Sequence, residues 1–172
     1  ATLWITGLHG SGKNELAYTL ERKLFDDGAT VMLMDGSTVR SGLSHELDYS
    51  PADRAEHLRR VAHVARMLND QGYIVICSFI SPYEDIRKQV AELIGESRFH
   101  TIHMDADLAF CKKNKPDLYE KAAAKDFVHI PGVDEPYEVP KNPNLKLHPK
   151  DRETNAEMVL NYLNQQKIFP IE

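Results

Sequence analysis

The chain has 172 residues, 42% of them hydrophobic and 27% charged, and a formal net charge of −5. This length and balance are ordinary for one globular domain with a core of its own. We therefore expect a single domain over residues 1–172, or alternatively the C-terminal part of a longer polypeptide.

The composition also excludes several classes of protein. The negative net charge argues against nonspecific nucleic-acid binding. No apolar run is long enough for a membrane span and no signal peptide opens the chain, so we expect a cytoplasmic protein without a membrane partner. Cys77 and Cys111 are too few for a disulfide framework, which fits a reducing compartment.

A glycine-rich segment directly follows the first apolar run, Leu3–Thr6, which predicts a buried strand. Gly7, Gly12 and Lys13 match the phosphate-loop pattern of Gly, four residues, Gly, Lys, then Ser or Thr. Apolar residues recur at helical spacing from Leu16 to Leu24. Strand, loop and helix in this order favour a phosphate site over a plain helix-opening loop, because backbone N–H groups and the helix N-terminus attract anions.

Asn14 stands where the pattern has Ser or Thr. That hydroxyl is the usual ligand of Mg²⁺, although the amide oxygen of asparagine can also bind a metal. We expect Lys13 to reach the outer phosphates of a bound nucleotide and Asn14 to face the metal. The residues predicted to bind the nucleotide are Gly7, His9, Gly10, Ser11, Gly12, Lys13 and Asn14.

Apolar runs alternate with amphipathic stretches along the rest of the chain. Further strands are predicted over residues 30–34, 73–77, 101–104 and, as a short one, 145–147. Helices are predicted over residues 53–69, 86–93 and 158–163. This alternation predicts an α/β fold with a parallel sheet covered on both faces. Ligands bind at the carboxyl ends of such strands, where we expect Asp35, Arg40, Phe79 and Ser81 to gather.

Residues 114–144 differ from the rest, because they contain five prolines and little apolar periodicity after Ala124. A long irregular segment inside a compact domain is usually a functional lid or a disordered loop. We expect a lid.

Four ordered motifs resemble the adenylylsulfate (APS) kinase family across nearly the whole chain. They are Asp35–Arg40, Leu47–Arg60, Ser78–Tyr83 and Gly132–Glu138. The resemblance implies a P-loop nucleoside-triphosphate hydrolase type of fold. It also implies transfer of the terminal phosphoryl group of ATP, with Mg²⁺, to the 3′-hydroxyl of APS, giving PAPS in sulfate assimilation.

The resemblance assigns roles to individual residues. Arg40 and Arg54 would bind the phosphosulfate, Tyr49 would stack on adenine, and Lys13, Asp35 and Ser81 would be catalytic. The implied substrate site consists of Arg40, Tyr49, Arg54, His57, Phe79, Ile80, Ser81 and Ile130. Structural alternatives are surface salt bridges for the arginines, a core aromatic for Tyr49, a half-buried helix histidine for His57, and a helix cap for Ser81.

The sequence departs from the family pattern at residues that the family uses for catalysis and nucleotide binding. Besides Asn14, Ser37 replaces the second Asp of an Asp-Gly-Asp motif, which leaves Asp35 to orient the hydroxyl or to hold Mg²⁺ through water. His57 replaces an Asn. In the lid, Val128 replaces a lysine and Ile130 replaces an aromatic residue.

Two functions from different classes therefore remain open. The first is an APS kinase that uses ATP and Mg²⁺. The second is a catalytically weak or inactive regulatory module that binds APS, PAPS or an adenine nucleotide. Fungal ATP sulfurylases carry such a kinase-like C-terminal domain, which senses PAPS. The expected partners are accordingly nucleotides, with a homo-oligomer or a fused ATP sulfurylase domain as the protein partner.

Overall fold

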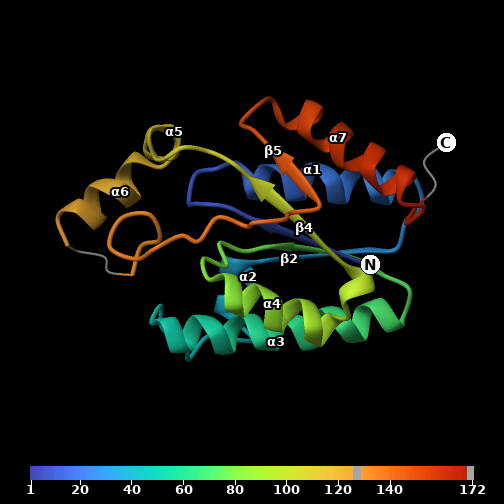
Figure 1. The fold of residues 1–172 in the computed structure, drawn as a ribbon, viewed down its shortest axis with the longest axis horizontal. Helices are drawn as coiled ribbons and strands as arrows, with labels where there is room; N and C mark the ends of the chain where they lie inside the picture. Colours follow the sequence, from blue (N-terminus) through green and yellow to red (C-terminus); the bar gives the residue numbers. More distant parts are fainter. Residues whose placement is uncertain (126–128, 170–172) are drawn as a thin grey trace.

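The computed structural model describes residues 1–125 and 129–169. Its centre is a parallel sheet of five strands in the order β2-β3-β1-β4-β5 (Figure 1). The strands are β1 (Thr2–Thr6), β2 (Val31–Asp35), β3 (Ile74–Ser78), β4 (Phe99–Met104) and β5 (Leu145–Leu147). Each predicted strand is present with its ends shifted by two residues at most, and the predicted α/β fold is confirmed.

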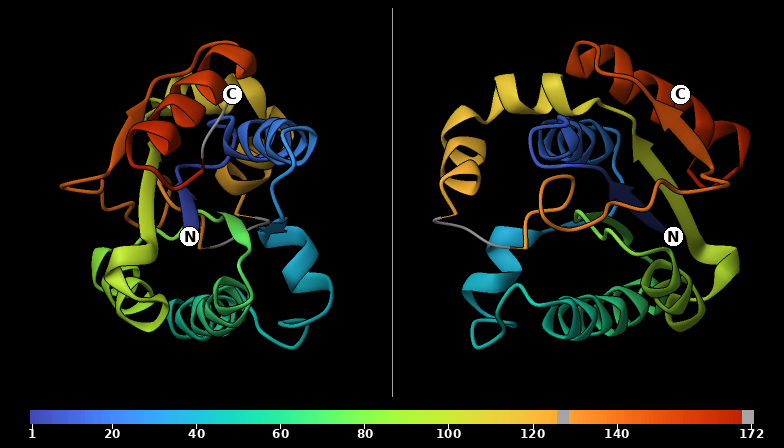
Figure 2. Two further views of the ribbon diagram at one scale, coloured as in Figure 1. Left: turned by 90° about the vertical axis from the view of Figure 1, so that its right-hand side faces the viewer. Right: turned by 60° about the vertical axis from the view of Figure 1, so that its left-hand side comes forward.

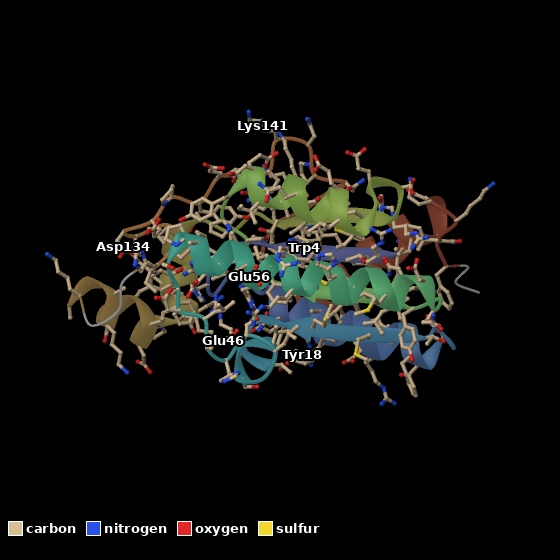
Figure 3. All side chains as sticks on the ribbon, turned by 90° about the horizontal axis from the view of Figure 1, so that it is seen from below. Trp4, Tyr18, Glu46, Glu56, Asp134 and Lys141 are labelled. Atoms are coloured by element: carbon tan, nitrogen blue, oxygen red, sulfur yellow. The ribbon has the colours of Figure 1, made fainter. Side chains whose placement is uncertain are left out.

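Helices cover both faces of the sheet (Figures 1 and 2). The helices are α1 (Lys13–Asp26), α2 (Gly36–Ser41), α3 (Pro51–Asp70), α4 (Glu84–Ile94), the 3-10 turn η1 (Glu96–Arg98), α5 (Leu108–Asn114), α6 (Pro116–Ala123) and α7 (Arg152–Gln165). Helices α1 and α7 pack on one face, and α3 and α4 pack on the other. In Figure 3, which looks at the second face, α3 lies in front.

Strands β1, β2 and β3 are apolar except at their ends, because a helix layer buries each face of the sheet, whereas β4 also carries His100, Thr101 and His103. In β1, Leu3 and Ile5 face the α1–α7 layer, while Trp4 packs with residues of α3 and α4. All three side chains are fully buried. Burial of this kind contributes roughly 1.5–3 kcal/mol per large side chain, so these layers fix the carboxyl edge of the sheet in place.

The carboxyl ends of the strands meet at one edge. Asp35 and Ser78 pair in register at the ends of β2 and β3, and Ser78 also pairs with Ile5 of β1. The loop that follows β1 begins at this edge. Helices α5 and α6 stand beyond the carboxyl end of β4, apart from the two main layers (Figure 1). They form a small core of their own with Tyr119, Ala122 and Ile130.

The lid segment is less irregular than predicted. Residues 116–123 form helix α6, because Pro116 suits the first helical turn and Tyr119 and Ala122 present an apolar side to Cys111. Residues 129–144 form a loop without a named strand or helix, as expected. Val128 lies outside the described residues. Among the described residues, no helix is long and apolar enough to cross a membrane.

Candidate active site

The loop between β1 and α1 has the backbone of a phosphate-binding loop. Gly12 caps α1 with a φ of 90°, and Gly10 has a φ of 81°. These left-handed conformations favour glycine. At Gly10, moreover, a Cβ atom would lie 2.6 Å from the carbonyl oxygen of Cys111. Lys13 begins the helix and donates from Nζ to the Leu8 carbonyl at 3.3 Å, so its ammonium group lies over the loop.

Two residues of the lid segment hold this loop from outside. The Tyr119 hydroxyl donates to the His9 carbonyl at 2.7 Å, and Asn114 Nδ2 donates to the Gly10 carbonyl at 3.0 Å. Sequence reasoning missed both contacts, because no spacing relates positions that lie more than a hundred residues apart. The loop is therefore braced by α5 and α6 in the shape that presents its N–H groups.

A cavity of about 220 Å³ lies between the loop, α2, α3 and the end of β3. Most of the predicted site residues line it together. They are His9, Lys13, Asn14, Arg40, Tyr49, Arg54, His57, Phe79, Ile80 and Ser81. Gly36, Ser37, Leu58, Ser78 and Pro82 complete the lining. None of the described lining residues carries a carboxylate, so the cavity is suited to an anion.

The protonation states of the titratable groups in the cavity also suit an anion. Burial, assisted by neighbouring cations, lowers the pKa of His9 to about 3 and the pKa of His57 to about 4. Both imidazoles are therefore neutral at pH 7. Burial also lowers the pKa of Lys13 to about 8, which leaves it mostly protonated. The positive charge at neutral pH comes from Lys13, Arg40 and Arg54, and a bound anion would compensate it.

Both arginines are held by backbone carbonyls. Arg54 is buried and donates from Nε to the Tyr49 carbonyl at 3.0 Å and from Nη2 to the His129 carbonyl at 2.5 Å. Arg40 donates from Nη1 to the Asp48 carbonyl at 2.9 Å. Neither forms an ion pair with another described residue, so the salt-bridge alternative fails for both. Their charges remain available to a ligand.

Tyr49 lies beside these two guanidinium groups. The Arg40 carbon Cζ sits 4.3 Å from the centre of the tyrosine ring, and that of Arg54 sits 5.4 Å away. Since Tyr49 is 53% exposed, the alternative of a core aromatic is wrong. The preceding segment is tied to α3 by Arg60, which bonds Glu46 at 2.5 Å and is itself held by Glu56 of the same helix at 2.9 Å. Figure 3 labels Glu46 and Glu56.

The Gly132–Glu138 motif builds the loop that holds Arg54. The Asp134 carboxylate accepts bonds from the backbone N–H groups of His129 at 2.7 Å and Ile130 at 2.5 Å. These bonds place the His129 carbonyl against Arg54. Ile130 is buried with Tyr119 in the lid core and is not among the residues lining the cavity, and its predicted contact with substrate stays a prediction.

Ser81 is fixed by the core of the fold. Its Oγ accepts a bond from Trp4 Nε1 at 3.0 Å and donates to the Phe79 carbonyl at 3.4 Å. The predicted capping role is wrong, because α4 begins at Glu84 and its cap, Tyr83, makes no side-chain bond. His57 is buried on α3 with its ring edge-on to Phe79, and its Nδ1 has no partner among the described residues.

Asp35 and Asn14 have protein partners at the positions where metal binding was predicted. The Asp35 carboxylate accepts hydrogen bonds from Ser37, Thr38 and Tyr18 and is not among the residues lining the cavity. Burial acts to raise its pKa, but these bonds outweigh burial and hold it at about 2. Asn14 Oδ1 accepts a bond from Ser78 Oγ at 2.6 Å. The roles predicted for Asp35 and Asn14 stay predictions.

A second cavity, of about 440 Å³, borders the same loop and shares no described lining residue with the first. Loop residues Gly10, Ser11 and Gly12 form one wall. The remaining lining residues are Glu15, Leu16, Met104, Phe110, Asn114, Lys115, Pro149, Lys150, Arg152 and Asn155. One phosphate-binding loop thus borders two neighbouring cavities.

Known proteins are similar to this chain in sequence and in fold. The sequence profile of the adenylylsulphate kinase family matches residues 1–148. The adenylyl-sulfate kinase of Staphylococcus carnosus is 37% identical over 170 residues, which cover 97% of this chain and 85% of that protein. The bifunctional enzyme NodQ of Rhizobium tropici is 47% identical over 148 residues, and the chain spans only 23% of its length.

Among solved structures, the Mycobacterium tuberculosis APS kinase CysC in complex with AMPPNP and APS superposes with a TM-score of 0.92. It is 40% identical, and the superposition covers 95% of this chain and 96% of that one. The chain therefore belongs to the adenylylsulphate kinase family and has the P-loop kinase fold.

Proposed function

We propose that this protein is an adenylyl-sulfate kinase, which transfers the terminal phosphoryl group of ATP to the 3′-hydroxyl of APS and releases PAPS. The observation that carries the proposal is the loop shared by two cavities, one of them lined by cations and by no described carboxylate. Phosphoryl transfer depends chiefly on positioning and on charge neutralisation, and both are available here.

The donor nucleotide occupies the loop and the second cavity in this proposal. The N–H groups of the loop and the start of α1 receive its phosphates, and Lys13 reaches the terminal one. Phe110 offers an apolar face to the base, while Lys115 and Arg152 add positive charge. These residues fit ATP because they combine an anion cradle with a partly apolar wall.

The acceptor occupies the first cavity. Arg40 and Arg54 bind the phosphosulfate, since a guanidinium presents paired donors to anionic oxygens. Tyr49 presents an exposed ring to the adenine. Phe79 and Ile80 form the apolar part of the wall, and neutral His57 offers one hydrogen bond. The complex of the related mycobacterial kinase with AMPPNP and APS supports this choice of two nucleotides.

The residues present fit a Mg²⁺ ion only as a partner of the donor's phosphates. Asn14 Oδ1 and Ser78 Oγ are uncharged oxygens at the cavity wall, and the described residues contain no cluster of three or more acidic, histidine or cysteine groups that would hold a metal. Mg²⁺ commonly keeps several waters and takes most of its charge balance from phosphates. When bound, it neutralises charge on the transferring group.

Ser81 positions the acceptor in this account. Its hydroxyl already bridges Trp4 and Phe79, and it is nearly fully buried, so a second role as a nucleophile would break two bonds. The transferred group passes through a transition state with loose bonds to both oxygens, which places little demand on a protein base. The chain's own contribution is therefore to hold the two nucleotides in line on either side of Lys13.

The alternative is a regulatory module that binds APS or PAPS without transfer. The absence of a carboxylate among the described lining residues favours it, because anion binding needs none. A fused sulfurylase partner belongs to this alternative, and the bifunctional relative NodQ gives it some support. A homo-oligomer stays a prediction.

Measuring whether ADP is released only in the presence of APS distinguishes the kinase from the regulatory module. We expect ATP and Mg²⁺ to yield ADP only when APS is added, and Lys13→Ala to abolish that release while leaving the melting temperature within a few degrees. Tight binding of PAPS without any APS-dependent ADP would favour the regulatory module.

A further inference from the structure

Asp35 ends β2 with a carboxylate that protein donors surround. Its Oδ1 accepts bonds from the N–H of Ser37 at 2.9 Å, the Oγ of Ser37 at 2.8 Å and the N–H of Thr38 at 3.0 Å. Its Oδ2 accepts bonds from Thr38 Oγ1 at 2.8 Å and from the Tyr18 hydroxyl at 3.0 Å. A carboxylate has about four lone-pair sites, so no site remains for a metal or a substrate hydroxyl.

Those donors belong mainly to helix α2, for which Asp35 is the N-cap. The helix has only six residues, too few to be stable from its own backbone bonds. Val39 anchors one side of it in the core. The Asp35 carboxylate accepts hydrogen bonds from two N–H groups of the first turn, which would otherwise lack partners.

Helix α2 in turn carries part of the anion cavity. Gly36 and Ser37 lie in its first turn and Arg40 in its last, and all three line the cavity, whereas Asp35 is not among the lining residues. Arg40 reaches the cavity from the last turn of this helix. Its guanidinium bonds the carbonyls of the following loop at Leu47 and Asp48.

We propose that Asp35 is a positioning residue: it holds helix α2, and through α2 the guanidinium of Arg40, against the anion cavity, and it neither takes a proton from the substrate nor binds the metal. This inference rests on the proposed function for the identity of the anion, APS. In the sequence, Asp35 was the one carboxylate predicted to be catalytic. The inference gives it a role in supporting substrate binding.

The side-chain chemistry of asparagine allows a sharp test. Asn is as good an N-cap as Asp, while it can act neither as a base nor as a charged metal ligand. We expect Asp35→Asn to keep APS affinity and turnover within about fivefold of the wild type. Asp35→Ala loses the cap and should weaken APS binding by about tenfold, within the range expected for a lost cap. APS affinity is measured by titration calorimetry and turnover by APS-dependent ADP release.

A base or metal ligand would behave differently. In that case Asp35→Asn would lower kcat by roughly a hundredfold or more while APS affinity stayed the same, and this result overturns the inference. Melting curves and circular dichroism establish that each variant is folded. If Asp35→Ala does not fold, the Asp35→Asn result still decides, because that variant keeps the cap.

A double-mutant cycle tests the path through Arg40. If Asp35 acts by placing Arg40, Asp35→Ala combined with Arg40→Ala should bind APS no more weakly than Arg40→Ala alone. Full additivity of the two losses contradicts the positioning role. A wild-type chain that binds no APS refutes the proposed function itself, whereas APS binding together with additive losses refutes only this inference.

Discussion

Arg54 should contribute a large part of the binding energy for APS. It is buried, and its two bonds to the carbonyls of Tyr49 and His129 use only some of its N–H donors. At least one charge-assisted bond to the ligand is therefore lost in Arg54→Ala. Such a bond contributes about 1.5–3 kcal/mol, which corresponds to a rise in the Kd of APS of roughly 10-fold to 150-fold.

Titration calorimetry with APS or PAPS measures this loss, and helix α3 offers a matched control. Arg59 lies on the same helix but is exposed and bonded to Glu56 at 2.7 Å, so Arg59→Ala should leave the Kd unchanged. Arg54→Ala also frees the Tyr49 and His129 carbonyls, and we expect its melting temperature to fall. A folded Arg54→Ala variant whose Kd stays within about twofold of the wild type would refute the assigned substrate site.

Three further predictions concern the loop and its surroundings. Gly10→Ala should reduce the free energy of unfolding by at least about 1–2 kcal/mol in urea titrations, because a left-handed residue with a Cβ atom 2.6 Å from Cys111 O strains the loop; an unchanged midpoint would contradict this. Lys13→Ala should lower kcat by roughly a hundredfold or more, and near-normal turnover would argue against its contact with phosphate. The pKa of Asp35 is about 2 in the folded chain against 3.8 normally, so its contribution to stability is complete above pH 4 and is lost as the pH falls toward 2. Urea midpoints of Asp35→Asn should therefore vary less over that range than those of the wild type, and equal slopes would speak against it.

The main elements of the fold could be predicted from apolar periodicity. Strands β1, β2 and β3 contain continuous apolar runs because both faces of the sheet are buried, and α3 shows a regular apolar side because it packs on one face only. Helix α2 could not be predicted in this way. Its six residues are too short for a periodic signal, and its first turn is capped by the Asp35 carboxylate.

The positions of the candidate site residues could be predicted where a motif fixes the backbone. The hydrogen-bond partners of their side chains were harder to predict. Arg40, Arg54 and Phe79 reach one cavity because the ends of β2 and β3 and the start of α3 meet there. The orientation of Asp35 depends on the hydroxyl groups of Ser37 and Thr38, which strand position alone does not reveal.

Long-range contacts explain why the surroundings of Ser81 and Ile130 could not be predicted from the sequence. Ser81 bonds Trp4, a residue 77 positions earlier, and this contact replaces the predicted helix cap. Ile130 packs beside Tyr119 in the lid core, a contact that its motif does not indicate. No local pattern in the sequence reports either partner.

The position of the transferred phosphate tests the account most directly. Phosphorus NMR of the chain with ATP, Mg²⁺ and APS follows both nucleotides in one sample. We predict that a new 3′-phosphomonoester resonance grows as the terminal phosphate signal of ATP declines, and that Lys13→Ala shows neither change. An unchanged ATP spectrum in a sample that still binds APS would contradict phosphoryl transfer and would make the protein a nucleotide-binding module built on a kinase fold.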